Sequence, residues 1–480
     1  MPKHGSRSNR AGATRFPRHA AATRTGVMAL SSLWLVAGSA HAVTPLNTYF
    51  GPGLPTDNYF PQGIPGEAEQ LGVTVRSRLR PDYDALGIRE GAFMIRPELD
   101  EQAGYDSNVV GNVNGKGSSE IQSNAAVSIN SNYSRNNIGF TAGINDTRYF
   151  DVPRFSHTDY NLSFGGGLDI GRDSLNGTVS YQNANEQPYD IGTNQTTNGT
   201  SSRAIIGTTA QGTAIGLAKP LNFSDTDFRV SYNTSIGRFV LTPNVDYQLL
   251  RFAHGDFTGV PIGSEFAYNQ TLRDTNILQG GVVARYEFQP QRSAVVVVNG
   301  NYDHYIHGSN QNIGIVDSTG ATILAGLDYQ LSGAITLRAL GGYQERFFNG
   351  NRYGNSGAPI GEADFIWNPT GLTTLTGRYG RTIEDATTNT VTGYTYDRLS
   401  LVLDHELYRN ILLQGSASFE NASYQGSNQQ QQNYGGGVGA TYLINRNVQA
   451  SLSYQYIEHT FTGSGSFGED IVLFHVKFGL

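Results

Sequence analysis

Apolar and polar residues alternate along most of this chain, in runs of about ten to fourteen residues between Gly91 and Leu480. In one such run Val245 and Tyr247 share a parity, whereas Asn244 and Asp246 occupy the intervening positions. A period of two places successive side chains on opposite faces of a β-sheet. The runs exceed the ~5–6 residues that strands of soluble proteins average and reach the ~9–11 residues that a tilted membrane-spanning strand needs.

The connections between these runs tend to alternate between short turns, several of which carry arginine, and long loops. Membrane barrels have this pattern, with short periplasmic turns and longer exterior loops. A soluble β-sandwich also alternates, but tyrosine and phenylalanine recur near the ends of the runs, where a membrane barrel has its aromatic girdles. We therefore predict an all-β, up-and-down antiparallel transmembrane barrel of about 18 strands, with 16 as the next even number.

Composition narrows the alternatives. Hydrophobic residues make up only 38% of the 480-residue chain, and no segment after the N-terminal region is long and apolar enough for a spanning helix. Aromatic residues reach 11%, whereas disordered chains have few. The absence of cysteine excludes disulfides and thiolate chemistry, and the net charge of -7 gives no reason to expect nucleic acid as a partner.

Residues 1–42 have the features of a secretory signal peptide. The first 26 residues contain six Lys or Arg and no acid, a mostly apolar run follows from Val27 to Ala37, and Ala40-His41-Ala42 is a cleavage site of the A-x-A type. We predict that the chain is secreted through the inner membrane and then inserts into the outer membrane. Residues 43–90, rich in Pro and Gly, predict an extended periplasmic or lumenal arm, and residues 91–480 form the barrel.

Charged residues on the polar parity are assigned to the lumen, because an arginine that faces lipid at the midplane costs ~2–4 kcal/mol. In one interpretation these charges pair and hydrate a rigid wall. In the other they form, with tyrosines, a track for sugars or an electrostatic filter. The candidate lumen-lining residues are Arg96, Glu98, Asp100, Arg229, Asp246, Arg285, Glu287, Asp303, Arg338, Arg346, Arg378, Arg398 and Asp404.

Indications of catalysis or metal binding are weak. Asp303 and His307 share parity, while Asp404 and His405 are adjacent and therefore on opposite faces. Histidine with an acid can activate a nucleophile, but such a pair near a strand end is usually structural. The sequence shows no spaced His/Asp/Glu cluster of the kind that binds zinc. We therefore predict no catalytic site, no metal and no cofactor.

Two features predict protein segments inside the lumen. Val295 and Val297 are apolar on the face that should be polar, so we expect them to pack against the arm or the long loop of residues 184–222. That loop either folds into the pore as a constriction or stays at the surface, and the sequence favours neither.

The residues that lead into the barrel resemble a known family. The motif R-x-x-Y-D-x-x-G-I-R, from Arg80 to Arg89, and the motif Y-D-x-N-V, from Tyr105 to Val109, are similar to a family of outer-membrane β-barrel porins. The resemblance covers about Val73 to Leu480. Members are commonly found with genes for capsule or exopolysaccharide production, which implies a role in polysaccharide export and partners in that process.

Other functions stay open at this point. The chain could instead be a diffusion porin for small hydrophilic solutes or sugars, a surface enzyme, or an adhesion or scaffold barrel with a plugged lumen. Outer-membrane lipids are expected to surround it, and the oligomeric state is not indicated. The final run resembles the C-terminal signal read by the barrel-assembly machinery, through the apolar face formed by Phe474, Val476, Phe478 and Leu480.

Overall fold

The computed structural model describes residues 73–189, 191, 205–208, 214–217, 219–255, 257–258, 270–308, 316–350, 354–385, 393–462 and 465–480. The predicted signal peptide and residues 43–72 of the predicted arm lie outside the described residues, so these two predictions are not tested.

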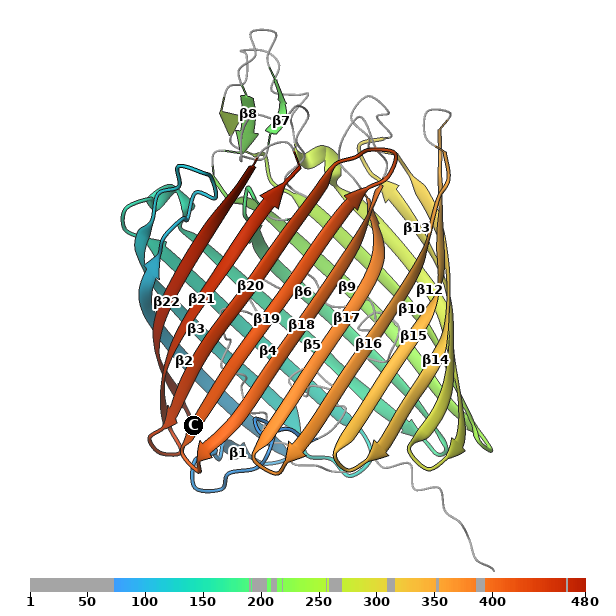
Figure 1. The fold of residues 1–480 in the computed structure, drawn as a ribbon. Coiled ribbons are helices and arrows are strands. Elements are labelled where there is room, and N and C mark those ends of the chain that lie inside the picture. Colours follow the sequence, from blue (N-terminus) through green and yellow to red (C-terminus); the bar gives the residue numbers. More distant parts are fainter. Residues whose placement is uncertain are drawn as a thin grey trace, which may run out of the picture. The chain divides into compact units, whose positions relative to one another are not determined.

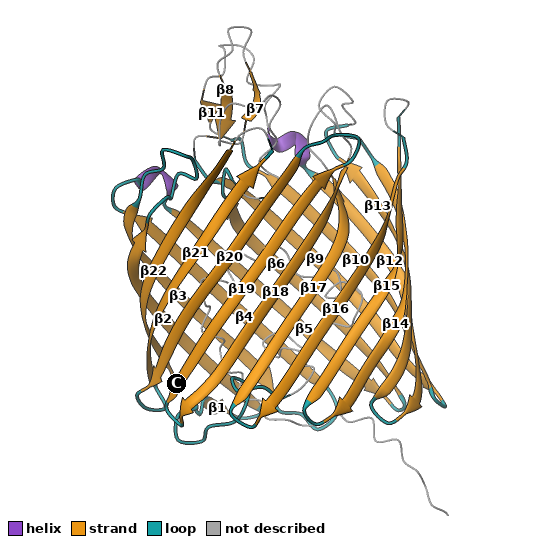
Figure 2. Cartoon of the chain, viewed as in Figure 1, coloured by secondary structure: helices purple, strands orange, loops and turns teal. Residues whose placement is uncertain are grey.

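Eighteen long antiparallel strands of 13 to 16 residues form a closed barrel, as predicted (Figures 1 and 2). The strands follow one another around the barrel in chain order, and β22 pairs with β2 to close it. A short extra strand, β1 (Ile88–Glu90), pairs with β2. The long strands are β2 (Phe93–Asp106), β3 (Ser118–Ser131), β4 (Asn137–Tyr149), β5 (His157–Ile170), β6 (Asp173–Glu186), β9 (Leu221–Ile236), β10 (Phe239–Phe252), β12 (Thr275–Gln289), β13 (Arg292–Tyr305), β14 (Ser318–Ser332), β15 (Ile335–Phe348), β16 (Ser356–Thr370), β17 (Thr373–Asp385), β18 (Gly393–Tyr408), β19 (Ile411–Tyr424), β20 (Gln430–Leu443), β21 (Val448–Phe461) and β22 (Gly465–Gly479).

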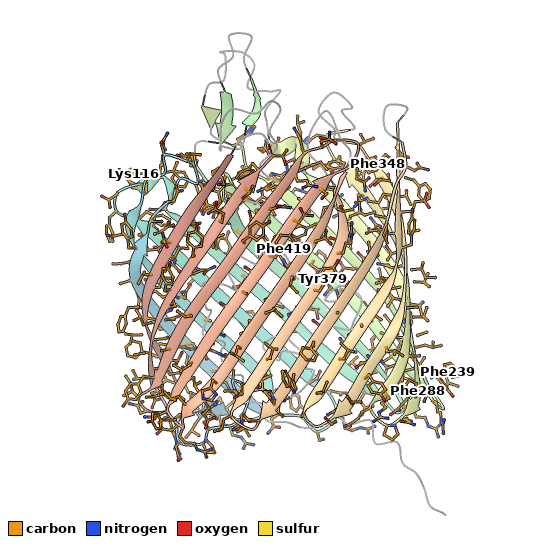
Figure 3. The ribbon with its side chains drawn as sticks, in the orientation of Figure 1. Lys116, Phe239, Phe288, Phe348, Tyr379 and Phe419 are labelled. Atoms are coloured by element: carbon orange, nitrogen blue, oxygen red, sulfur yellow. The ribbon has the colours of Figure 1, made fainter. Side chains whose placement is uncertain are left out.

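One register runs through all eighteen strands and separates two faces. Apolar side chains on the outer face are open to the surroundings, with Val245 and Val438 54% and 63% exposed. Aromatic side chains gather at the strand ends: the ring of Phe239 lies 4.7 Å from the ring of Tyr286, and Phe288 is at the same end of the barrel (Figure 3). An apolar belt bordered by aromatic rings is the surface that a bilayer covers.

The two ends of the barrel differ in their connections. At the end that holds the C-terminus, which we call the short-turn end, the connections are short (Figure 1): two-residue turns join six of the strand pairs, and five and four residues join β3 to β4 and β20 to β21. Gly171 and Gly237 begin two of these turns with φ of 75° and 64°. Glycine is favoured there because a tight hairpin needs a positive φ at its first central residue, which other residues adopt at a cost.

The opposite, long-loop end carries the remaining elements. Three short strands, β7 (Ile205–Thr208), β8 (Ala214–Leu217) and β11 (Phe257–Thr258), form a separate sheet in the order β11-β8-β7. Of two 3-10 helices, η1 (Pro153–Phe155) lies in the loop between β4 and β5, and η3 (Gln270–Arg273) lies in the loop between β10 and β12 that also carries β11. No helix in the described part of the chain is long and apolar enough to cross a membrane.

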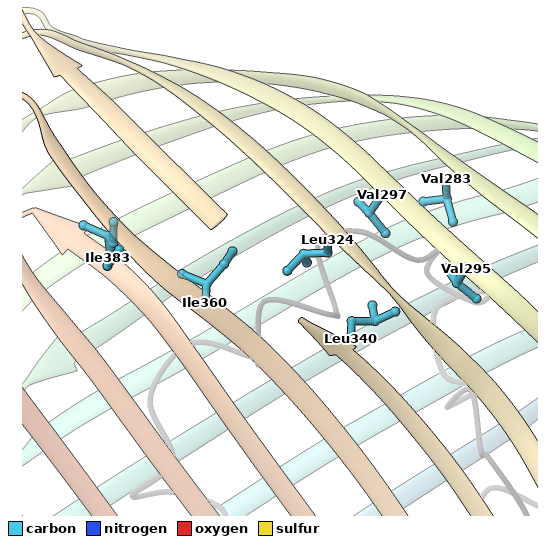
Figure 4. Close-up of a cluster of buried hydrophobic side chains, with 8 residues drawn as sticks. Val283, Val295, Val297, Leu324, Leu340, Ile360 and Ile383 are labelled. Carbon is cyan, nitrogen blue, oxygen red and sulfur yellow. The ribbon is translucent and has the colours of Figure 1, made fainter. Parts of the chain in front are cut away.

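An apolar patch interrupts the lumen face of β12 to β16 (Figure 4). Val295 and Val297 are each 1% exposed and pack with neighbours that include Leu324 and Ile360. The described part of the predicted arm and the described residues of the long loop are not members of this cluster. The contact predicted for these valines therefore remains a prediction for segments outside the described residues.

The last residues of β17 cover one edge of the patch. Pairing of β17 with β16 stops at Arg381 opposite Gly361. Beyond that point the backbone N–H of Ile383 donates to the Gln344 side chain on the lumen face of β15, 3.2 Å away, and Ile383 joins the apolar cluster. The end of β17 thus separates from β16 and turns toward the inner face of β15, while it stays paired with β18 up to Asp385 opposite Gly393.

Candidate functional site

The strand register places all thirteen candidate lumen residues on the inner face of the barrel. Residues that pair across neighbouring strands point to the same face of the sheet, and the inner set is continuous around the closed barrel. The candidates come from eight strands: Arg96, Glu98 and Asp100 on β2, Arg229 on β9, Asp246 on β10, Arg285 and Glu287 on β12, Asp303 on β13, Arg338 and Arg346 on β15, Arg378 on β17, and Arg398 and Asp404 on β18.

Many of these charges form ion pairs between strands. Arg229 lies 2.6 Å from Asp246 on the next strand and 2.9 Å from Asp227 on its own strand. Arg346 reaches across β14 to Asp303 on β13. Such charge-assisted hydrogen bonds are stronger than neutral ones, so they hold the inner side chains in place. Further pairs join Arg338 and Arg285 to Asp328, Arg378 to Asp364, and Arg398 to Glu420.

Residues 73–86, which we call the mouth segment, dock on the inner face of the barrel at the short-turn end. The backbone N–H of Val75 donates to Thr374 on β17 at 2.9 Å. Val75 itself is 1% exposed and packs on Leu412 of β19 and Leu443 of β20. This part of the predicted arm is therefore lumenal rather than free in the periplasm.

Three arginines at alternate positions attach the mouth segment to β18. Arg76 lies 2.7 Å from Asp404, and Arg80 lies 2.9 Å from Glu406. Arg78 lies 3.6 Å from the same Glu406. Asp404 and Glu406 are two residues apart on one strand, so both carboxylates face the lumen. Together they form the ion pairs with the three arginines.

The first sequence motif folds the mouth segment. The Arg80 side chain donates to the Val75 carbonyl at 2.7 Å, and the Asp84 backbone N–H donates to the Arg80 carbonyl at 2.7 Å. Tyr83 packs against the cluster around Val75. Partial burial raises the pKa of the Asp84 carboxyl, against the opposing effect of Arg80. Gly87 has a φ of 75° where the chain turns toward β1, a conformation that favours glycine.

The second motif shapes the first long loop. The Asn108 backbone N–H donates to Asp106 at 2.7 Å, and the Asn108 side chain donates to the carbonyls of Asn112 and Gly468 at 3.0 and 3.2 Å. Val109 is 2% exposed and packs with Phe155 of η1. The motif residues thus fold the loop after β2 compactly against its neighbours.

The beginning of the long loop after β6 crosses the mouth of the barrel at the long-loop end. Tyr189 is 3% exposed, its carbonyl accepts from Gln431 of β20 at 3.1 Å, and its ring lies 5.4 Å from His459 of β21. Ile191 packs against the cluster of Tyr394 and Tyr424 on β18 and β19. In the barrel order seven strands separate β6 from β19 on the shorter side. The described start of this loop therefore narrows the mouth.

The residues considered for catalysis are held apart by other partners. Asp303 pairs with Arg346, whereas His307 lies 3.2 Å from Asp274. Asp404 pairs with Arg76, and His405, on the other face of β18, contacts Thr373 at 3.0 Å. Among the described residues, no group of three or more His, Cys, Asp or Glu is arranged to hold a metal ion.

The sequence left open whether the arm and the long loop enter the lumen, and it did not predict the contacts that hold them at the two barrel mouths. The pattern R-x-R-x-R at residues 76–80 and the pattern D-x-E at residues 404–406 have matching spacing and opposite charge, and this could have indicated their pairing. Tyr189 carried no comparable signal, because its partners lie on strands far away in the sequence.

A closed barrel with an apolar outer belt and a charged inner face defines the class of outer-membrane porin-type proteins, and this fold implies an outer-membrane location. The model of the family described as "Putative beta-barrel porin 2" matches residues 80–478, and the chain belongs to this family. No curated protein matches the sequence.

Solved outer-membrane structures show a similar fold at low identity. The copper transporter OprC is 10% identical, with 82% of this chain and 84% of that chain covered and a TM-score of 0.44. OpdK from Pseudomonas aeruginosa is 11% identical, with 80% and 99% covered and a TM-score of 0.42. The FrpB iron transporter from Neisseria meningitidis is 10% identical, with 78% and 62% covered and a TM-score of 0.42.

Proposed function

We propose that this protein is a passive channel for hydrophilic solutes across the outer membrane. The observation that carries the proposal is the contrast between its faces: exposed apolar side chains outside, and ion pairs between charged side chains inside. A barrel that served only as a scaffold would not require a charged inner face. The mouth segment and the Tyr189 crossing set the width of the two mouths.

Planar-bilayer recordings of the purified mature protein test this proposal. We expect discrete conductance steps. Replacing residues 73–86 by a Gly/Ser linker of equal length should raise the step size, because the arginines that attach the mouth segment are lost. A matched control is Arg89→Ala, which removes an exposed arginine just after the segment. If neither the natural protein nor the linker variant conducts, the barrel is plugged and the scaffold alternative replaces the channel.

A finer proposal is that the transported material is an extracellular or capsular polysaccharide. Its support is the motif resemblance at Arg80–Arg89 and Tyr105–Val109, together with amide side chains on the inner face that are not fully buried, such as Gln182 and Gln279. The driving force would come from export partners or gradients. Deleting the gene should remove polysaccharide from the cell surface while uptake of small solutes continues. Unchanged surface polysaccharide, with slower solute uptake, would favour the diffusion porin.

The proposal includes secretion by an N-terminal signal peptide, insertion by the barrel-assembly machinery and contact with outer-membrane lipids. It does not include catalysis. Alanine at Asp303, His307 and Asp404 should leave any hydrolysis of surface substrates by these cells unchanged. Loss of such hydrolysis in single variants would establish a surface enzyme instead.

A further inference from the structure

Carboxylates outnumber cations on the inner face of the described strands. The strand register assigns twenty carboxylates and eight cations to this face. The carboxylates are Glu98, Asp100, Asp106, Glu120, Asp159, Asp169, Glu186, Asp225, Asp227, Asp246, Glu287, Asp303, Asp328, Glu362, Asp364, Glu384, Asp404, Glu406, Glu420 and Glu469. The cations are Arg96, Arg229, Arg285, Arg338, Arg346, Arg378, Arg398 and Lys477.

The excess of carboxylates over cations is concentrated on one side of the lumen. The eight adjacent strands β22, β2 to β6, β9 and β10 carry eleven of the carboxylates and three of the cations, and we call their inner face the acidic wall. The other ten strands carry nine carboxylates and five cations. Arg76, Arg78 and Arg80 of the mouth segment add three positive charges there, so the cations on this side almost equal the carboxylates in number. The acidic wall receives no such addition from the mouth segment's ion pairs. From the described connections, ion pairs join two arginines to it: Arg273 of η3, 3.1 Å from Glu186, and Arg135 of the turn after β3, 3.9 Å from Asp169.

Two of the three cations on the acidic wall are already held by local carboxylates. Arg229 contacts Asp227 and Asp246, and Lys477 lies 3.1 Å from Glu98.

Other carboxylates on this wall are held by neutral groups. Asp225 accepts from the amides of Gln182 and Gln248 at 3.3 and 3.0 Å. Asp100 is 8% exposed; its Oδ2 accepts from the Gln102 amide at 3.0 Å and lies 3.7 Å from His475, whereas its Oδ1 accepts no hydrogen bond from the described residues. The buried, unpartnered oxygen and the amide-held carboxylate make this wall suited to bind cations.

On the opposite wall, two lumenal carboxylates are already paired with positive groups of the chain itself. The guanidinium groups of Arg76 and Arg80 sit on Asp404 and Glu406 inside the short-turn mouth. Lumenal carboxylates therefore bind positive groups of the chain at the point where the mouth segment narrows the bore.

We propose that the lumen is selective for cations: it favours cationic and neutral hydrophilic solutes and disfavours anions, acidic polysaccharides included. This inference rests on the proposed channel function and deepens it. A bore with low-dielectric walls and charge of one sign focuses the field and concentrates ions of opposite sign, and rings of Asp and Glu select cations in known channels.

The test is the ratio of potassium to chloride permeability, from reversal potentials under a 0.1 M to 0.01 M KCl gradient. The Debye length is ~10–30 Å at these concentrations, so the wall charges act across the bore. The test variant combines Asp100→Asn, Asp159→Asn and Asp225→Asn on the acidic wall. The matched control combines Glu101→Gln, Asp146→Asn and Asp173→Asn, which change the charge equally on the outer face.

We expect a ratio above one for the natural protein, a fall of at least about twofold in the acidic-wall variant, and no change in the control. A ratio at or below one, with normal conductance, overturns the inference and leaves the channel intact. An equal fall in both variants also overturns it, because the effect would not come from the lumen. Absence of conductance in all proteins overturns the channel proposal itself and the inference with it.

Discussion

The guanidinium of Arg80 lies 2.9 Å from the carboxylate of Glu406, and each side chain is only 4% exposed. At this degree of burial both groups have lost most of their water, so each charge depends on the other. Removing one partner of a buried pair costs about 3–5 kcal/mol, whereas replacing both by apolar residues is often neutral. This asymmetry makes the pair the best single point at which to probe the mouth segment.

Arg80→Ala should therefore release the mouth segment without unfolding the barrel. We expect faster proteolytic cleavage within residues 73–86 than in the natural protein, and a larger conductance step in planar bilayers. The double variant Arg80→Met with Glu406→Leu should recover part of the protection, because no buried charge is left unpaired. Arg89→Ala, at an exposed position of the same region, is the control. Equal proteolysis of the natural protein and Arg80→Ala would contradict docking through this pair.

At the scale of elements, two contacts decide how the barrel closes and how its mouth is narrowed. Strand β22 closes the barrel and pairs on both sides, with Phe478 opposite Val448 on β21 and opposite Leu99 on β2. At the other end the loop after β6 is held by Tyr189. Gly111 lies against this tyrosine: a Cβ there would be 2.0 Å from the ring, and its φ is 63°.

Deleting residues 476–480 should block insertion of the barrel. The deletion removes the outer-face Phe478 and four of the nine residue pairs between β22 and β2, from Glu101–Val476 to Glu98–Gly479, so the sheet keeps unpaired edges at the short-turn end. The measurement is the fraction of heat-modifiable, membrane-inserted protein. Phe419→Ala, on the outer face of β19, is the control, since it removes an aromatic ring without opening the barrel. Normal insertion of the truncated chain would refute this role of β22.

Tyr189→Ala and Gly111→Ala should both loosen the crossing at the long-loop end. The first removes the ring that packs on His459 and Phe467, and the second displaces it. We expect larger conductance steps from both variants, with Tyr160→Ala on the outer face unchanged. If only Tyr189→Ala alters conductance, the contact with Gly111 does not hold the crossing.

At the scale of the whole molecule, the barrel reverses the usual distribution of polarity. Apolar side chains such as Phe474 and Val298 are 50% and 52% exposed, while Asp303 and Glu469 are 4% and 0% exposed. A surface of this kind is stable in a bilayer, where the lipid covers it, and aggregates in water.

The mature protein should consequently require detergent or lipid to remain dispersed, and its circular dichroism should be that of β-sheet. Both properties follow from the closed sheet and its exposed belt. Sedimentation with and without detergent, together with the far-ultraviolet spectrum, measures them. A protein that stays monodisperse in buffer alone, or that is mainly helical, would be incompatible with this barrel.

The sequence by itself determined the long strands and the two faces, and it limited the number of strands to about 18, with 16 as the alternative. A period-two pattern is local, so Val245 outside and Asp246 inside follow from neighbouring residues alone. Only the tertiary structure decided which segments of the chain enter the barrel and which strands they contact. Arg76 meets Asp404 across 328 positions of the chain, and Gln431 meets Tyr189 across 242. Such contacts depend on barrel closure and on where each loop enters the lumen, and no local pattern encodes either.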